Sequence, residues 1–278
     1  MPTFKIIADS SADLRSFAGA AFDSAPLKII TADREYVDDR TLDVAEMVDD
    51  LSRYKGKSSS SCPNPQEWLE RFEDAPYVFC VTISGTLSGS YNAAIAAKEL
   101  YEEAHPDRRV HVINSLSTGP EMKLLIERMS EEIASGQSFD DICADIDRYC
   151  RNTALIFVLE SMKNLANNGR VSPLVAKAAG LLGIRVVGKA SDRGDLQPLD
   201  KCRGQERALD AVVRRMEESK YIGSKVRIAH CFNEAGAKAL KTRLIKRFGP
   251  IDVEIYPCGG LCSFYAEKGG LLVGFEHV

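Results

Sequence analysis

The sequence predicts an α/β protein of two domains, with a parallel sheet flanked by helices in the first domain and a mixed sheet in the second. Two observations lead to this prediction. Residues 4–135 alternate apolar, β-branched segments with helix-forming segments, an order that is typical of parallel sheets. After residue 153, a turn at 192–195 joins two strand-like segments as a hairpin, which adds antiparallel neighbours to the second sheet. At 278 residues and 45% apolar content, the chain is long enough for both cores.

The first half contains three strand and helix units. Their strands are predicted at 4–8, 77–83 and 110–113, and their helices at 66–72, 91–104 and 121–135. The stretch 57–65 separates the first two strands and holds four serines and two prolines, so it is predicted to be a loop.

The second half mixes helices with hairpins. Helices are predicted at 139–151, 173–182, 204–219 and 234–248, the last capped by Asn233, and strands at 154–159, 185–190, 196–199, 226–232, 253–256 and 271–275. The predicted domains are therefore 1–153 and 154–270, and the tail 271–278 can return to either one.

Charge and cysteine content exclude several classes of protein. The net charge is −4 and the basic residues form no blocks, so bulk attraction to nucleic acid is not expected. The apolar runs are strand-sized, far below the roughly 20 residues that cross a bilayer. The N-terminus lacks a signal-peptide pattern, and we expect a cytoplasmic protein. The eight cysteines form no zinc-binding set, so neither a metal nor a cofactor is predicted. A redox pair of Cys258 and Cys262 stays open.

Polar side chains follow each of the three strands of the predicted parallel sheet. These turns are Asp-Ser-Ser at 9–11, Ser-Gly-Thr at 84–86 and Asn-Ser at 114–115. Ligands bind beyond the carboxyl ends of the strands in such sheets, where these turns gather. The pattern therefore predicts a ligand site at this edge.

The segment 84–90 is the richest of these turns, and its helix is predicted to begin at Ser88 or Ser90. A helix start attracts anions through free backbone N–H groups. The spacing fits neither a phosphate-binding P-loop, nor GxGxxG, nor the GxSxG nucleophile turn. Hydroxyls without a base bind anions rather than transform them. An enzyme of phosphoryl or acyl transfer on a small anionic substrate remains the alternative, with Asp9 or His230 as its base.

Several motifs resemble those of one family. Segment 84–92, SGTLSGSYN, resembles the SSxLSGTYQSA motif of the DegV family, bacterial fatty-acid-binding proteins whose FakB members present a fatty acid to a separate kinase. Further motifs agree in order: IADSS at 7–11 with DST, SSCPNP at 60–65 with TSQPSP, NLANNGRV at 164–171 with NLxKxGRI, KCR at 201–203 with KxR, and GGLLVGF at 269–275 with GGLGLGY. The resemblance spans essentially the whole chain.

The resemblance implies a DegV-like fold and a carrier that is not an enzyme. In this family a fatty acid lies between the two domains, with its tail in an apolar tunnel and its carboxylate on hydroxyl groups. The implied partners are a long-chain fatty acid, a fatty acid kinase subunit and, transiently, a membrane surface. The residues implied to bind the carboxylate are Ser60, Ser61, Ser84, Ser88, Ser90 and Tyr265, and those implied to contact a partner or membrane are Arg170 and Arg203.

One position departs from the family pattern, and one segment is a candidate for the tunnel wall. Tyr265 stands where the family usually has histidine, and its hydroxyl donates a hydrogen bond but stays neutral near pH 7. This change suits lipid binding and leads to the hypothesis that the protein works with an atypical kinase or with none. For the tunnel wall we expect the helix 173–182, with Ile156 and Val158 nearby; ordinary core packing explains these residues equally well.

Overall fold

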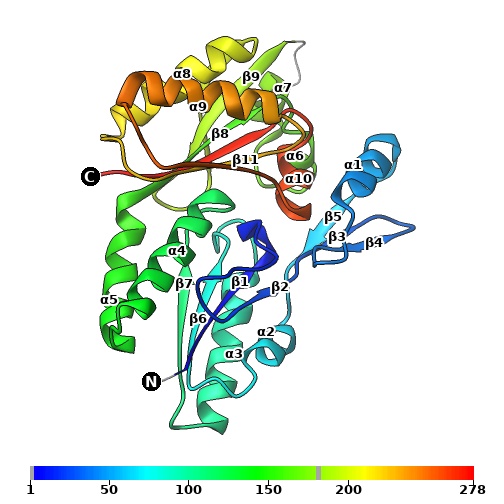
Figure 1. Ribbon diagram of the computed structural model, residues 1–278. Coiled ribbons are helices and arrows are strands. Elements are labelled where there is room, and N and C mark those ends of the chain that lie inside the picture. Colours follow the sequence, from blue (N-terminus) through cyan, green and yellow to red (C-terminus); the bar gives the residue numbers. More distant parts are fainter. Residues whose placement is uncertain (1–2, 180–182) are drawn as a thin grey trace.

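The computed structural model describes residues 3–179 and 183–278, and it contains a parallel sheet and a mixed sheet separated by helix α4 (Figure 1). The parallel sheet has the order β2-β1-β6-β7, and each neighbouring pair is parallel. Its strands are β1 (Phe4–Asp9), β2 (Phe22–Ala25), β6 (Tyr77–Thr82) and β7 (Arg109–Asn114). The parallel sheet predicted from the alternating pattern is confirmed.

Helices cover both faces of the parallel sheet, because successive side chains on its strands point to opposite sides. On one face lie α2 (Pro65–Phe72) and α3 (Ser90–Ala104), around the fully buried Trp68 and Phe72. On the other face lie α4 (Pro120–Ala134) and α5 (Phe139–Tyr149). There Phe139 stacks on Phe79, with the ring centres 5.0 Å apart.

A small antiparallel sheet projects beside the parallel sheet, and the sequence did not predict it (Figure 1). Its order is β4-β3-β5, formed by Glu35–Val37, Lys28–Ile30 and Ser59–Ser61, and it carries α1 (Val44–Arg53). The prediction of a loop throughout 57–65 is therefore wrong. Three serines form β5 because the backbone of β3 offers them partners, with Ser60 opposite Ile29.

The mixed sheet has the order β10-β9-β8-β13-β11-β12. Its strands are β8 (Thr153–Leu159), β9 (Ile184–Ala190), β10 (Leu196–Arg203), β11 (Val226–His230), β12 (Val253–Pro257) and β13 (Leu271–Glu276). The predicted hairpin is present as β9 and β10, while β11 and β12 are parallel. The last strand, β13, lies between β8 and β11, so the C-terminal tail joins the mixed sheet.

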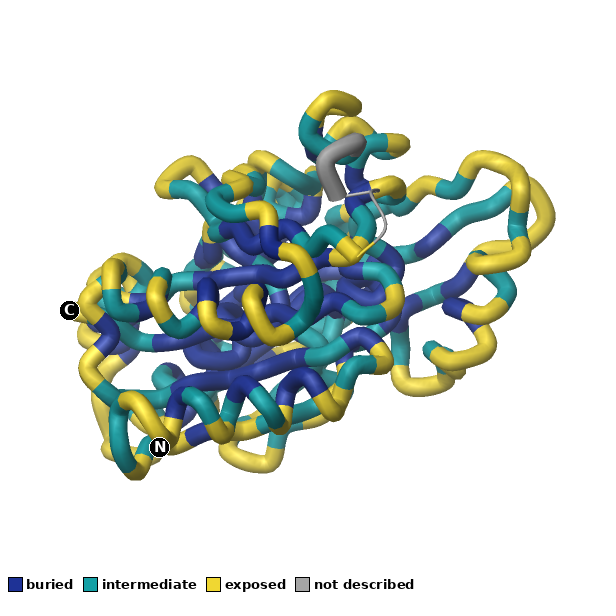
Figure 2. The backbone as a smooth tube through the Cα atoms, turned by 90° about the horizontal axis from the view of Figure 1, so that it is seen from above, coloured by how far each residue is buried: buried dark blue, intermediate teal, exposed yellow. Residues whose placement is uncertain are grey.

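Helices also divide between the two faces of the mixed sheet. The long helices α8 (Gln205–Glu218) and α9 (Glu234–Phe248) cover one face (Figure 1). The shorter helices α6 (Lys163–Asn167), α7 (Pro173–Ala179) and α10 (Gly260–Ala266) pack with the opposite face. Buried residues run along both sheets in Figure 2. None of the helices in the described residues is long and apolar enough to cross a membrane.

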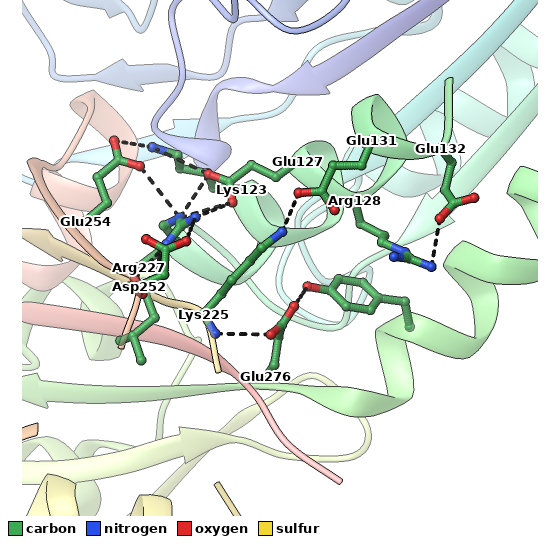
Figure 3. A network of polar contacts seen from close by, with 12 residues as sticks. Lys123, Glu127, Arg128, Glu131, Glu132, Lys225, Arg227, Asp252, Glu254 and Glu276 are labelled. Carbon is green, nitrogen blue, oxygen red and sulfur yellow. Dashed lines mark hydrogen bonds and ion pairs between the residues drawn. The ribbon is translucent and has the colours of Figure 1, made fainter. Parts of the chain in front are cut away.

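Helix α4 joins the two sheets through close packing and ion pairs. Its first turn approaches β13 so closely that a Cβ on Gly274 would lie 2.6 Å from the backbone nitrogen of Glu121. Farther along, Arg227 of β11 pairs with Glu127 of α4 at 2.8 Å and with Asp252 at 2.9 Å, within the network of Figure 3. Arg227 is buried, and these carboxylates compensate its charge. These contacts fix the mixed sheet above the parallel one.

Candidate ligand-binding site

A largely apolar cavity lies between the two sheets. Most of the side chains that line it come from β8 and β13 of the mixed sheet, from the segment that follows β6, and from α6 and α10, and others come from β5, from the start of β10 and from the segment before β3. The apolar ones are Leu27, Ile83, Leu87, Leu155, Phe157, Leu159, Leu165, Leu196, Leu261, Ala266 and Leu272. Such a lining favours a ligand with a long apolar part.

A pair of hydroxyl groups borders this cavity. Tyr265 Oη lies 2.7 Å from Ser60 Oγ, which joins α10 to β5. The guanidinium of Arg170 lies 5.8 Å from the centre of the Tyr265 ring, within the range of a cation–π contact. Arg170 is the only charged residue among the described residues that line the cavity.

Arg170 also connects this hydroxyl pair to the segment after β6. Its Nε donates to the carbonyl of Leu87 at 3.1 Å, and Leu87 precedes Ser88, which lines the cavity. On the neighbouring turn, a Cβ on Gly89 would lie 3.1 Å from Cys62 Sγ, so the start of α3 lies close to the loop that follows β5. The cavity thus has a polar border made by Ser60, Ser88, Arg170 and Tyr265.

Two of the predicted serines point elsewhere. Ser90 Oγ donates to Asp9 Oδ2 at 2.7 Å, inside the core, where burial raises the pKa of Asp9. Ser84 is fully buried under the β9–β10 hairpin, and a Cβ on Gly194 would overlap its Oγ. Its Oγ accepts from the backbone nitrogen of Thr86 at 3.3 Å, as a turn residue does. Both serines hold the turn rather than border the cavity.

Ser61 and Arg203 also lie outside the cavity lining. Ser61 neighbours Ser60 on β5, and successive strand residues point to opposite sides. Arg203 is exposed at the end of β10. Of the eight candidate residues, the structure brings four to one cavity.

The lining includes residues that the sequence analysis missed. Thr118 borders the cavity and donates to the carbonyl of Ser11 at 3.3 Å. Its position shortly after β7, at the edge where a ligand site was predicted, is the signal in the sequence that could have identified it. Of the two explanations left open for Ile156 and Val158, core packing is the one that holds, because both face α8 and α9, while their neighbours Leu155, Phe157 and Leu159 line the cavity. Part of the predicted helix 173–182 lies outside the described residues.

The bases considered for an enzyme do not reach this cavity. His230 lines a separate groove with Asp13 and Tyr256, and burial lowers its pKa. Asp9 is enclosed by Ser11, Ser90 and the backbone of Ile83. Cys262 lines the cavity as a neutral thiol, because burial raises its pKa well above the ordinary value. No group of residues in the described chain is arranged to hold a metal ion.

Comparison with known proteins identifies the family to which this chain belongs. A model of the DegV family, described as uncharacterised proteins, matches residues 3–277. The chain belongs to the DegV family. A DegV domain-containing protein of Streptococcus pneumoniae is 44% identical over 99% of both chains.

Solved structures of DegV proteins agree over the full length. A DegV family protein from Eubacterium eligens, loaded with heptadecanoic acid, is 42% identical with a TM-score of 0.98 and covers 99% of this chain and 100% of its own. The Streptococcus pneumoniae fatty acid kinase (Fak) B3 protein, loaded with linoleic acid, is 43% identical with a TM-score of 0.97 and the same coverage.

Proposed function

We propose that this DegV protein is a carrier that holds one long-chain fatty acid, with the tail in the cavity between the sheets. The observation that supports this most strongly is an apolar cavity bordered by the hydroxyls of Ser60 and Tyr265 and lined by no carboxylate of the described residues. The two similar proteins loaded with heptadecanoic and linoleic acid support the same ligand class.

The tail supplies most of the affinity in this proposal. Burying a methylene group contributes roughly 0.8 kcal/mol, so a tail of about fifteen methylenes contributes about 12 kcal/mol before the costs of binding. A short acid buries too little apolar surface to offset those costs. Affinity is therefore expected to rise steeply with chain length.

The carboxylate sets the orientation of the ligand. Ser60, Ser88 and Tyr265 are the hydroxyl donors proposed for it, and hydrogen bonds to an ionised carboxylate are stronger than neutral ones. Arg170 adds a positive charge at the same border, held in place by the carbonyls of Leu87 and Asn168. The ligand's negative charge is thus balanced without a fully buried cation.

A separate kinase subunit is the proposed partner. The bound carboxylate would be offered to that kinase for phosphorylation, and this chain itself catalyses no step. Arg170 and Arg203 are proposed to contact the kinase or a membrane surface. The exposed position of Arg203 is compatible with this role. Charge reversal at Arg203 should weaken such contacts and leave lipid retention intact.

Isothermal titration of the delipidated protein tests the carrier proposal. We expect palmitate, oleate and linoleate each to bind with one molecule per chain, and hexanoate to give no measurable heat of binding. A protein that binds hexanoate as well as palmitate, or binds none of the long-chain acids, would contradict it.

A further inference from the structure

Helix α10 supplies Tyr265 to the cavity, and it is too short to fix its own position. It has seven residues, Gly260–Ala266, and four of them line the cavity: Leu261, Cys262, Tyr265 and Ala266. The first backbone N–H groups of a helix have no partner inside it. Whatever binds these groups therefore determines where α10, and with it the Tyr265 hydroxyl, lies.

Two carboxyl groups from the first half of the chain take these N–H groups. Asp38 accepts from the nitrogens of Gly260 and Leu261, both at 2.8 Å, with one side-chain oxygen for each. Asp13 accepts from the nitrogen of Gly259, also at 2.8 Å. Asp38 is only 4% exposed, so water does not weaken its contacts.

The glycines at the start of α10 allow these contacts. A Cβ on Gly260 would lie 2.7 Å from Asp38 Oδ1, and a Cβ on Gly259 would lie 2.9 Å from Asp13 Oδ1. Both distances are too short for a real Cβ atom. A side chain at either position would push its carboxyl group away. The two glycines therefore leave the space in which the two aspartates bind the start of α10.

The other end of α10 is held by different elements. Asn164 of α6 donates to the carbonyl of Phe264 at 2.8 Å, and Tyr265 Oη meets Ser60 Oγ at 2.7 Å. Contacts therefore hold α10 at both ends. Those of Asp38 lie at its start, and the hydroxyl of Tyr265 lies near its end.

We propose that Asp38 is a positioning residue for carboxylate recognition, acting through α10 on the Tyr265 hydroxyl. This inference rests on the proposed fatty-acid binding. Asp38 does not line the cavity. Its two bonds set the height of α10 above β5, and this height decides whether Tyr265 Oη can meet both Ser60 and a ligand oxygen.

The test compares oleate with oleyl alcohol, which has the same chain and no carboxylate. Asp38→Asn places an NH₂ group against one of the two N–H donors. We expect it to weaken oleate binding about tenfold and to change alcohol binding by less than about twofold, as loss of one charged hydrogen bond would. Tyr265→Phe should give the same pattern. The double variant should lose little beyond Tyr265→Phe alone, because both changes remove one interaction.

Two further variants complete the experiment. Asp39→Asn is the matched control, because the Asp39 side chain accepts from Thr41 in its own turn and not from α10. It should leave both affinities unchanged. Asp13→Gly removes the bond to Gly259 and should give a smaller loss, about threefold, selective for oleate. If Asp38→Asn does not fold, the Asp13 variant is used as the test in its place.

The outcomes separate this inference from the proposed function. Provided that the unchanged protein binds oleate, two results would overturn the positioning role. One is an equal loss of affinity for oleate and oleyl alcohol in Asp38→Asn. The other is a double variant whose loss of oleate affinity equals the product of the two single losses. An unchanged protein that binds neither ligand would instead overturn the proposed function, and the positioning role with it.

Discussion

Tyr265 Oη lies 2.7 Å from Ser60 Oγ although the two residues are 205 positions apart. The contact joins α10, beside the mixed sheet, to β5 of the small sheet, and it lies at the border of the apolar cavity. The fold thus brings together two hydroxyl donors from segments that are far apart in the sequence. The following predictions test what this pair and its surroundings do.

Replacement of Tyr265 by histidine tests the link to a kinase. The tyrosine hydroxyl is neutral, whereas an imidazole can carry a positive charge near neutral pH. We expect Tyr265→His to retain oleate within about threefold, since the tail dominates affinity. It should raise the rate at which a standard fatty acid kinase forms acyl phosphate. An assay of acyl phosphate from both proteins checks this, and a faster rate for the unchanged protein would contradict it.

Ser88 and Ser90 should differ in what their loss affects. Ser88 borders the cavity, so Ser88→Ala is expected to weaken oleate binding by about five- to tenfold with little change in stability. Ser90 bonds the buried Asp9, so Ser90→Ala should lower the free energy of unfolding by about 1–3 kcal/mol and leave the affinity of the folded protein unchanged. Chemical denaturation and titration of both variants decide the matter. The reverse pattern would show that the turn binds the ligand through Ser90.

Neighbouring residues on β8 should separate ligand selection from core stability. Leu155 lines the cavity, and Ile156 faces α8 and α9. Leu155→Ala enlarges the cavity and should shift the ratio of affinities toward longer or bulkier acids. Ile156→Ala should cost about 2–5 kcal/mol of stability and leave that ratio unchanged. Competition between palmitate and linoleate measures the ratio, and an equal shift in both variants would place the tail elsewhere.

The buried Glu121 predicts a dependence of stability on pH. Burial raises the pKa of its carboxyl from 4.5 to about 7, although Thr153 donates to it at 2.8 Å. The folded protein therefore keeps a proton that the unfolded chain loses above about pH 4.5, so the free energy of unfolding falls as pH rises toward about 7, by up to about 1.4 kcal/mol per unit.

Glu121→Gln isolates this effect, because glutamine accepts the same hydrogen bond and does not titrate. We expect a flatter fall in stability between about pH 4.5 and 7 in denaturation curves of the variant. The fall that remains should extend to about pH 8, because burial raises the pKa of Asp13 to about 8. Identical slopes in both proteins would contradict the raised pKa of the buried Glu121.

Alternation along the chain was enough to predict the parallel sheet, and the turn at 192–195 was enough to predict the β9–β10 hairpin, because both depend on local pattern. The strand β5 was missed because three serines carry no apolar signal and pair only where β3 offers an edge. The sequence left open whether Ile156 and Val158 face the cavity or the core. Every residue of 154–159 is apolar, and a strand buried on both faces does not reveal which side meets a cavity.

The polar border was predictable in part. Ser60, Ser88, Arg170 and Tyr265 came from the family resemblance, and the structure brings these four to one cavity. Ser84 and Ser90 belong to the same motif, yet their side chains hold the turn and its link to Asp9. Spacing in a motif does not say which hydroxyl points inward, since that direction depends on the β9–β10 hairpin packed above Ser84.

Mass spectrometry of an organic extract tests the carrier proposal most directly. The protein is purified without added lipid, extracted and measured for fatty acids against its molar amount. We predict close to one long-chain fatty acid per chain, with uptake of added oleate or palmitate after delipidation. Recovery of no lipid, together with failure to take up either acid, would contradict the proposal that the cavity holds a fatty acid.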